Sequence, residues 1–157
     1  NFLEIGECDI AFIREEPKVN EKLAKIHFSN DHLVAVLPQA HRLAKSERIT
    51  LSELADESFL FLNQGTVMYD LSVNACRNAG FEPSIAYTGK RAENILDLVK
   101  EGMGISLLME KPITYLNSKG VTMVPIYPEI KTDINVYHSK TKELTPITKA
   151  FIEFICN

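Results

Sequence analysis

Short apolar runs alternate with amphipathic segments along most of the chain. An apolar run bounded by turn residues predicts a buried strand, and apolar positions that recur every three or four residues predict a helix. Strands are expected at residues 8–13, 23–31, 32–38, 59–62, 84–89, 105–109, 121–127 and 133–139. Helices are expected at residues 66–79, 91–101 and 145–156, with a short one from residue 50 to about residue 56. This alternation indicates an α/β architecture with largely parallel strands.

Polar residues and glycines mark the ends of the predicted helices. Thr50 and Glu53 fit a capping box, in which the Thr50 hydroxyl accepts from the backbone N–H of residue 53 and Glu53 reaches back. Thr145, followed by proline, predicts the start of the last helix, and Gly80 predicts the stop of helix 66–79. The last helix carries an apolar stripe, interpreted as core packing or a subunit contact, that consists of Ile147, Phe151, Phe154 and Ile155.

Two glycines lie one residue apart in LVKEGMGISLLM, residues 98–109. A dinucleotide-binding loop needs its glycines after a strand and before a helix, and the third glycine of that motif is replaced here by Leu107. The order is also reversed, because helix 91–101 comes before the glycines. Gly102 is therefore interpreted as the residue that ends this helix with a positive φ, and Gly104 as a tight passage into the next strand. No phosphate-binding loop is predicted.

Composition and charge limit the possible functions. The chain has 157 residues, of which 45% are hydrophobic and 24% charged, as in an ordinary globular protein. A net charge of -4 disfavours direct binding to duplex DNA, which needs a basic surface. No apolar run approaches the roughly 18 residues of a membrane span, so no membrane partner is expected. Three cysteines argue against a disulfide framework and favour a reducing compartment, and the four histidines form no cluster that predicts a metal site.

Six segments follow one another along nearly the whole chain: FLEIGECDIAFIR, DHLVAVLPQAHRLAKSERITLSELADESFLFLNQGT, ACRNAGFEPSI, ILDLVKEGMGISLLM, GVTMVPI and TPITKAFIEFI. In this order and spacing they closely resemble the effector-binding domain of LysR-type transcriptional regulators. The most specific parts are the LP…HRLA segment followed by LSELADESFL, and the corner LVxxGxGI.

The resemblance implies a type 2 periplasmic-binding-protein-like α/β fold. Two α/β lobes are joined by crossover strands, and a small effector, expected to be an anion, lies in the cleft between them. Residues 1–36 plus 134–157 are expected to form lobe I, and residues 37–133 to form lobe II. Family members have more sequence before DIAF. The chain is therefore expected to be N-terminally truncated, with lobe I incomplete and residues 2–7 as the last turn of a helix.

Partners and location follow from the same resemblance. We expect the ligand-sensing part of a cytoplasmic transcriptional regulator, which binds a small-molecule effector, uses no cofactor and is not an enzyme. The full-length protein is expected to be a homo-oligomer, a dimer or tetramer, that contacts DNA only through a missing N-terminal helix-turn-helix. Two alternatives stay open: an extracytoplasmic solute-binding protein of a transporter, and a small α/β enzyme. The chain has no Gly-x-Ser-x-Gly elbow that would support an esterase-type enzyme.

Arg14 is the first candidate for effector binding. In the family, the end of the strand at residues 8–13 faces the cleft. A guanidinium at this place can hold a carboxylate through two parallel hydrogen bonds. The alternative is a surface or lobe-bridging arginine that pairs with Glu15 or Glu16.

A second group of candidates is the loop of Asn63, Gln64, Gly65 and Thr66, which joins a strand to a helix. Ligands of open α/β sheets favour this location, and free backbone N–H groups at a helix start attract anions. Thr66 can donate its hydroxyl to a ligand, or it can cap the helix by accepting a hydrogen bond. Gly65 allows close approach of the backbone to a ligand, or simply a turn.

Arg91 and Cys76 complete the candidates. Arg91 begins helix 91–101, whose start opens toward the cleft in the family. A basic residue there opposes the helix dipole, which indicates a role beyond helix stability; the alternative is a solvated charged turn. Peroxide-sensing family members use a reactive thiol nine residues before a second cysteine. Cys76 matches the second position, but Val67 occupies the first, so peroxide sensing by this route is not expected and Cys76 is interpreted as a buried apolar residue.

Overall fold

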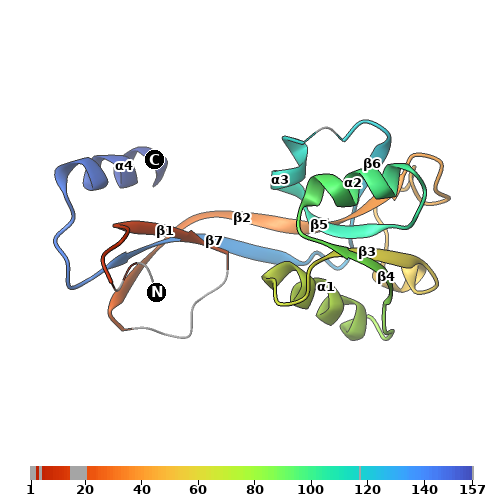
Figure 1. The fold of residues 1–157 in the computed structure, drawn as a ribbon, viewed down its shortest axis with the longest axis horizontal. Coiled ribbons are helices and arrows are strands. Elements are labelled where there is room, and N and C mark those ends of the chain that lie inside the picture. Colours follow the sequence, from red (N-terminus) through yellow and green to blue (C-terminus); the bar gives the residue numbers. More distant parts are fainter. Residues whose placement is uncertain (1–2, 4, 15–20, 117, 157) are drawn as a thin grey trace. The chain divides into compact units, whose positions relative to one another are not determined.

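The computed structural model describes residues 3, 5–14, 21–116 and 118–156 and shows a mixed α/β chain (Figure 1). It divides into two compact units: unit 1 comprises Asn1–Asp31 and Thr132–Asn157, and unit 2 comprises His32–Lys131. The chain therefore passes between the units twice. The expected lobe boundaries lie a few residues further along the chain, and the assignment of lobes stays a prediction. The helix turn expected at residues 2–7 falls partly outside the described residues.

Unit 1 is built on strands β1 (Ile10–Ile13), β7 (Lys131–Ser139) and the first part of β2 (Leu23–Pro38). Their order in the sheet is β1-β7-β2, and β1 pairs with β7 in antiparallel fashion. The separate strands expected at residues 23–31 and 32–38 form the single strand β2. One continuous strand can form here because no glycine or proline interrupts it before Pro38.

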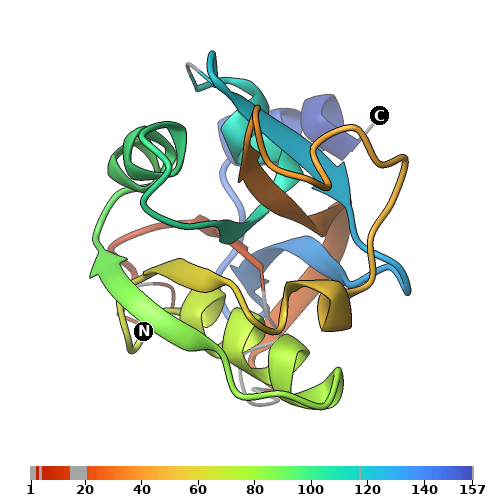
Figure 2. The same cartoon turned by 90° about the vertical axis from the view of Figure 1, so that its right-hand side faces the viewer.

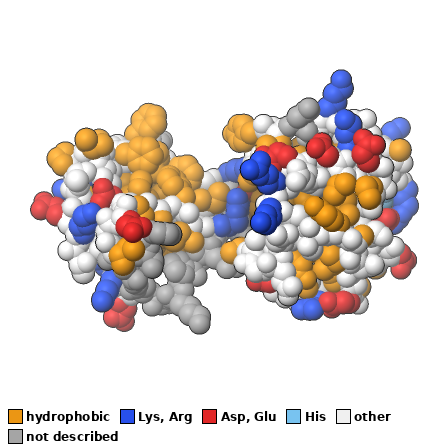
Figure 3. All heavy atoms as spheres, viewed as in Figure 1, with side chains coloured by type: hydrophobic (Ala, Val, Ile, Leu, Met, Phe, Trp, Pro, Cys, Tyr) orange, Lys and Arg blue, Asp and Glu red, His pale blue; other side chains and the backbone are white. Residues whose placement is uncertain are grey.

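Helix α4 (Pro146–Cys156) leaves most of its apolar stripe exposed, which bears on the first of the two interpretations given for it, core packing or a subunit contact. Its apolar stripe is not buried: Ile147 and Phe154 are each 82% exposed and Phe151 is 43% exposed. The one buried residue of this fully described helix is Thr148. Figure 3 shows hydrophobic side chains gathered over α4 and β1. Core packing is therefore the wrong interpretation for the exposed members of the stripe.

Unit 2 has a central mixed sheet. β3 (Ser58–Leu62) pairs in parallel with β4 (Ser84–Gly89), and a parallel bridge between Phe59 and Ile105 connects β3 to the start of β5 (Ser106–Met109). β5 and β6 (Val121–Pro125) both pair with β2, and both pairings are antiparallel.

The expectation of largely parallel strands is therefore wrong for β2 and for β1. The physical reason is the connection. A parallel neighbour needs a crossover, usually a helix packed on the same sheet. β2 instead enters unit 2 as the continuation of a strand that begins in unit 1.

Helices cover both faces of the sheet in unit 2 (Figure 2). α1 (Val67–Asn78) and the short 3-10 helix η1 (Leu51–Leu54) pack on one face, and α2 (Ala92–Lys100) and α3 (Glu110–Thr114) pack on the other. The alternation of side chains along β3 explains this arrangement, because Phe59 and Phe61 join one apolar cluster while Leu60 joins the other. α3 was not expected, since a helix this short has too few residues to show a helical period.

The predicted helix ends are confirmed at several positions. Gly80 and Gly102 follow their helices with φ values of 95° and 76°, respectively. The Glu53 carboxylate accepts hydrogen bonds from the Thr50 backbone N–H at 2.8 Å and from the Thr50 hydroxyl at 2.9 Å. These bonds favour the charged carboxylate and lower the pKa of Glu53, with the backbone bond as the larger cause.

Cys76 is fully buried on α1, as predicted, and burial raises the pKa of its thiol to about 12. We expect a thiolate-specific reagent to label the exposed Cys156 in the folded protein while Cys76 reacts only after unfolding. The same pKa shift makes the stability of the fold depend on pH. Because the folded thiol of Cys76 keeps its proton above the ordinary pKa of 9.0, its contribution to the free energy of unfolding is complete below pH 9.0 and decreases as the pH rises toward 12. Peptide mapping after a time course of labelling measures the labelling rates of Cys76 and Cys156. Equal rates for the two cysteines would contradict the prediction.

Candidate functional site

Arg14 lies in unit 1, directly after β1, and contacts both of the strands that continue toward unit 2. Its Nη1 donates to Asp31 Oδ2 on β2 at 3.2 Å and to Thr132 Oγ1 on β7 at 3.1 Å. The Asp31 side chain is completely buried, whereas that of Arg14 is 22% exposed. These contacts hold the guanidinium in place and leave other N–H groups of its planar fork to bind a further anion. The alternative partners Glu15 and Glu16 lie outside the described residues.

The loop of residues 63–66 follows β3 and leads into α1 in unit 2. The Thr66 hydroxyl accepts from the Tyr69 backbone N–H at 3.2 Å and donates to the Asn63 carbonyl at 2.7 Å. Thr66 is therefore the helix cap, and its single hydroxyl proton is already in use. Gly65 has a φ of 86°, a left-handed conformation that glycine adopts without strain and that turns the chain into the helix.

Arg91 lies at the same edge of the sheet as this loop. β4 runs parallel to β3 with Gly89 opposite Leu62, so both strands end side by side. The Asn63 N–H donates to the Gly89 carbonyl at 2.9 Å, which connects the two loops. Arg91 then occupies the cap position of α2 and makes no side-chain capping bond. The structure thus brings together the starts of α1 and α2.

This edge of unit 2 is suited to an anion. Each helix start presents backbone N–H groups without partners inside the helix, together with the positive end of the helix dipole. Lys90 and Arg91 are exposed there and add positive charge. The acidic residues Asp70 and Glu93 lie in the first turns of the two helices and partly offset it. Arg14 belongs to the other unit, so its grouping with this edge stays a prediction.

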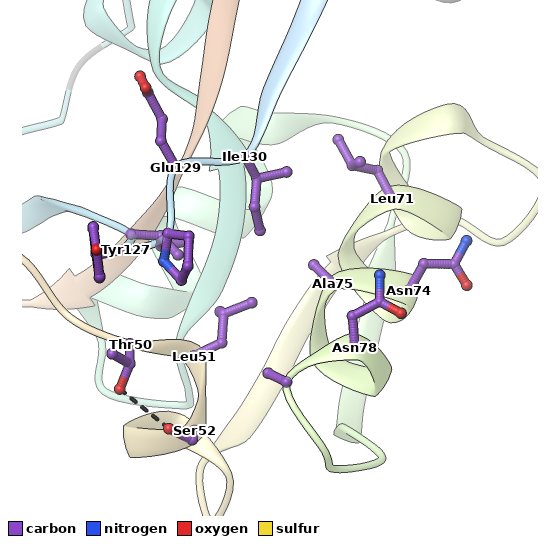
Figure 4. Close-up of a pocket in the computed structure, with 13 residues that line it drawn as sticks. Thr50, Leu51, Ser52, Leu71, Asn74, Ala75, Asn78, Tyr127, Glu129 and Ile130 are labelled. Atoms are coloured by element: carbon purple, nitrogen blue, oxygen red, sulfur yellow. Dashed lines mark hydrogen bonds between the residues drawn. The ribbon is translucent and has the colours of Figure 1, made fainter.

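A cavity of about 490 Å³ lies elsewhere in unit 2, between α1, η1 and the segment after β6 (Figure 4). Sequence reasoning missed it, because its walls come from three separate segments and none of them carries a motif that indicates ligand binding. Its lining residues are Thr50, Leu51, Ser52, Leu71, Asn74, Ala75, Asn78, Ala79, Ile126, Tyr127, Pro128, Glu129 and Ile130.

Within the described residues of the chain, no helix combines the length and the hydrophobicity of a transmembrane span. The same residues contain no group of three or more His, Cys, Asp or Glu side chains placed to hold a metal ion.

Comparison with known families decides the classification. The family model of the LysR substrate binding domain matches residues 1–156. The chain belongs to this LysR family. The resemblance inferred from the six segments is thereby confirmed, and so is the periplasmic-binding-protein-like α/β fold class.

Among the curated relatives of this LysR domain is the transcriptional dual regulator GltC of Bacillus subtilis (strain 168). It is 28% identical over 151 residues, which cover 95% of this chain and 50% of GltC. The chain therefore spans about half the length of this relative.

Solved structures share the fold of this LysR domain. The C-terminal domain of a probable LysR family regulator from Rhodococcus sp. RHA1 matches with a TM-score of 0.86 and 25% identity, over 99% of this chain and 78% of that one. The BenM effector binding domain with its effector benzoate matches with a TM-score of 0.83 and 22% identity, over 98% of this chain and 70% of that one. These relatives are regulators, so the comparisons do not support the alternative of a transporter's solute-binding protein.

Proposed function

We propose that this LysR domain is the ligand-sensing part of a transcriptional regulator and that it binds a small organic anion. In unit 2, the proposed contacts are Asn63, Gln64, Gly65 and Thr66, together with Arg91. In unit 1, the proposed contact is Arg14. The observation that carries the proposal is that the starts of α1 and α2 lie together at the ends of β3 and β4, with Lys90 and Arg91 beside them.

The chemistry of this edge supports an anion more than a neutral ligand. Backbone N–H groups at a helix start and a nearby guanidinium are donors without acceptor capacity, and both gain from a negative partner. Because the Thr66 hydroxyl proton is donated to Asn63, the donors that remain for a ligand are backbone N–H groups of the helix starts, the side-chain amides of Asn63 and Gln64, and the cations of Lys90 and Arg91. The benzoate in the BenM domain is a carboxylate, which agrees with this ligand class.

A matched ligand panel tests the proposal. The purified chain is screened by thermal unfolding against small carboxylic acids and the corresponding neutral amides, and hits are measured by calorimetry. We expect at least one acid to bind and its amide to bind much more weakly. Arg91→Gln should weaken acid binding by about tenfold, the effect of losing one charge-assisted hydrogen bond.

Arg77→Gln is the control, because Arg77 is exposed near the opposite end of α1 and pairs with Glu82 at 2.8 Å. It should leave the affinity unchanged. Equal binding of acid and amide, or an Arg91→Gln variant that binds like the unchanged chain, would contradict the anion site.

For the full-length protein we propose a cytoplasmic homo-oligomer that contacts DNA through a segment outside this chain. The gene sequence upstream of the Asn1 codon tests the proposed DNA-contacting segment directly. A basic helix-turn-helix supports the regulator, whereas a signal peptide would contradict it. A bound ligand should also be recovered chemically unchanged after prolonged incubation. Product formation would show that the chain acts as an enzyme.

A further inference from the structure

We propose that the cavity beside the C-terminal half of α1 binds a neutral, amphipathic small molecule with a ring-sized apolar body and one hydrogen-bonding end. The cavity is distinct from the proposed anion site. It is lined by α1 residues from Leu71 onward, whereas the anion site lies at the start of this helix. The inference therefore does not depend on the proposed function.

The walls of the cavity are apolar and positioned by the core. Leu51, Ala75 and Ile126 line it and are almost fully buried. Figure 4 shows Leu51 and Ile130 pointing across the space toward Leu71 and Ala75. Leu71, Ala79 and Ile130 also line the cavity but are only partly buried. Contact with apolar groups of a ligand would remove water from these three side chains, which is the main favourable term in such sites.

The cavity is large enough for a small molecule that has both an apolar ring and a hydrogen-bonding group. Ligand pockets in proteins usually have volumes of about 300–1,000 Å³, and this cavity has a volume of about 490 Å³ and is partly open to solvent. An apolar cavity of about 150 Å³ already accommodates a benzene ring. The space persists beside α1 because the helix presents the small residues Ala75 and Ala79 to it.

Uncharged hydrogen-bonding groups lie around the cavity on two sides. Asn74 and Asn78 lie one turn apart on α1, and both are exposed at the cavity. Across from them, the Thr50 and Ser52 hydroxyls lie 3.1 Å apart. The Thr50 hydroxyl donates its proton to Glu53, and the Ser52 hydroxyl donates to Thr50, so these two hydroxyls can only accept from a ligand. The amides can both donate and accept, so the set suits the donor of an alcohol, amide or heterocyclic N–H.

The side chains that line the cavity favour a neutral ligand over an anion. Glu129 is the charged residue among the lining residues of the described chain. Its carboxylate points away from the cavity in Figure 4 and pairs with Lys131 Nζ at 3.0 Å. Glu129 Oε1 also lies 3.3 Å from His32 Nδ1. The lining set includes neither lysine nor arginine, so a negative ligand would lose its hydration without gaining a partner.

Binding of the neutral fluorophore N-phenyl-1-naphthylamine tests the cavity in solution. The chain has no tryptophan, so the fluorophore is measured against a low protein background. We expect saturable binding with one probe per chain. Ala75→Phe places a ring inside the cavity and should weaken this binding at least about tenfold. Phe154→Ser, which removes an exposed apolar side chain from α4, is the control and should leave the affinity unchanged.

Methyl NMR of the unsubstituted chain with added indole tests the same site without any variant. The proposal expects the largest shift changes at Leu51, Leu71, Ile126 and Ile130. Shift changes that concentrate instead at Ile147 and Ile155 of α4, or no changes at all, would overturn it. Probe binding that is lost in Phe154→Ser and retained in Ala75→Phe would overturn it as well.

Discussion

Gly104→Ala is expected to lower the free energy of unfolding by about 3 kcal/mol, the upper end of the cost of overpacking. A Cβ atom at this position would lie 2.5 Å from the Ser58 carbonyl oxygen and 3.1 Å from Leu60 Cγ. The Ser58 carbonyl belongs to β3 and accepts the Ile105 N–H at 2.9 Å. Because the obstacle is backbone, no change of rotamer can relieve the clash, and the connection between β3 and β5 has to shift.

Gly102→Ala is the matched control in the same corner. Gly102 has a φ of 76°, and an added Cβ would meet no heavy atom within 4 Å among the described residues. The cost there is the left-handed strain of about 1 kcal/mol. Urea unfolding of both variants, followed by circular dichroism, measures the difference. Equal costs, or a larger cost at Gly102, would contradict the explanation by close packing.

Arg14→Ala is expected to lower the free energy of unfolding by about 2 kcal/mol. Removing one partner of a fully buried ion pair usually costs about 3–5 kcal/mol, and the partial exposure of Arg14 reduces this value. The substitution deprives the fully buried Asp31 carboxylate of its contact with Nη1 and also removes the bond to Thr132.

Arg77→Ala is the control for this prediction, because it breaks an arginine–carboxylate pair of better geometry on the surface. Both nitrogen–oxygen distances between Arg77 and Glu82 are 2.8 Å, but the two side chains are 56% and 67% exposed. Water and salt screen such a pair, so its loss should shift the urea midpoint much less. An Arg14→Ala variant as stable as Arg77→Ala would contradict the argument that burial makes the Arg14–Asp31 pair contribute more to stability than the exposed Arg77–Glu82 pair.

Local signals along the chain predicted most of the elements correctly. The apolar runs at residues 59–62 and 105–109 are β3 and β5 almost to the residue. Helix α1 starts after its predicted cap, Thr66, and its end at Gly80 is equally well marked. These features depend on neighbouring residues alone, through side-chain periodicity, capping and the freedom of glycine at positive φ.

The partners of the candidate residues depend on contacts between distant segments. Arg14 pairs with Asp31 and with Thr132, which lies 118 positions away, while the suggested partners were its own neighbours. Arg91 comes beside Asn63 because β3 and β4 end together. No pattern in either segment specifies which strand becomes its neighbour, since pairing is selected by the packing of the whole sheet.

By itself, the sequence determined most of the strands and helices, the caps of the helices and the membership in the LysR family, because each of these is encoded in short segments and their spacing. Only the tertiary structure decided the antiparallel course of β2, the exposure of the α4 stripe and the cavity beside α1. These three features depend on which segments, distant in sequence, pack against one another in the folded chain. A stripe such as Ile147, Phe151 and Phe154 has the same pattern whether it is covered or open, and a cavity exists only where side chains from separate segments fail to fill the space between them.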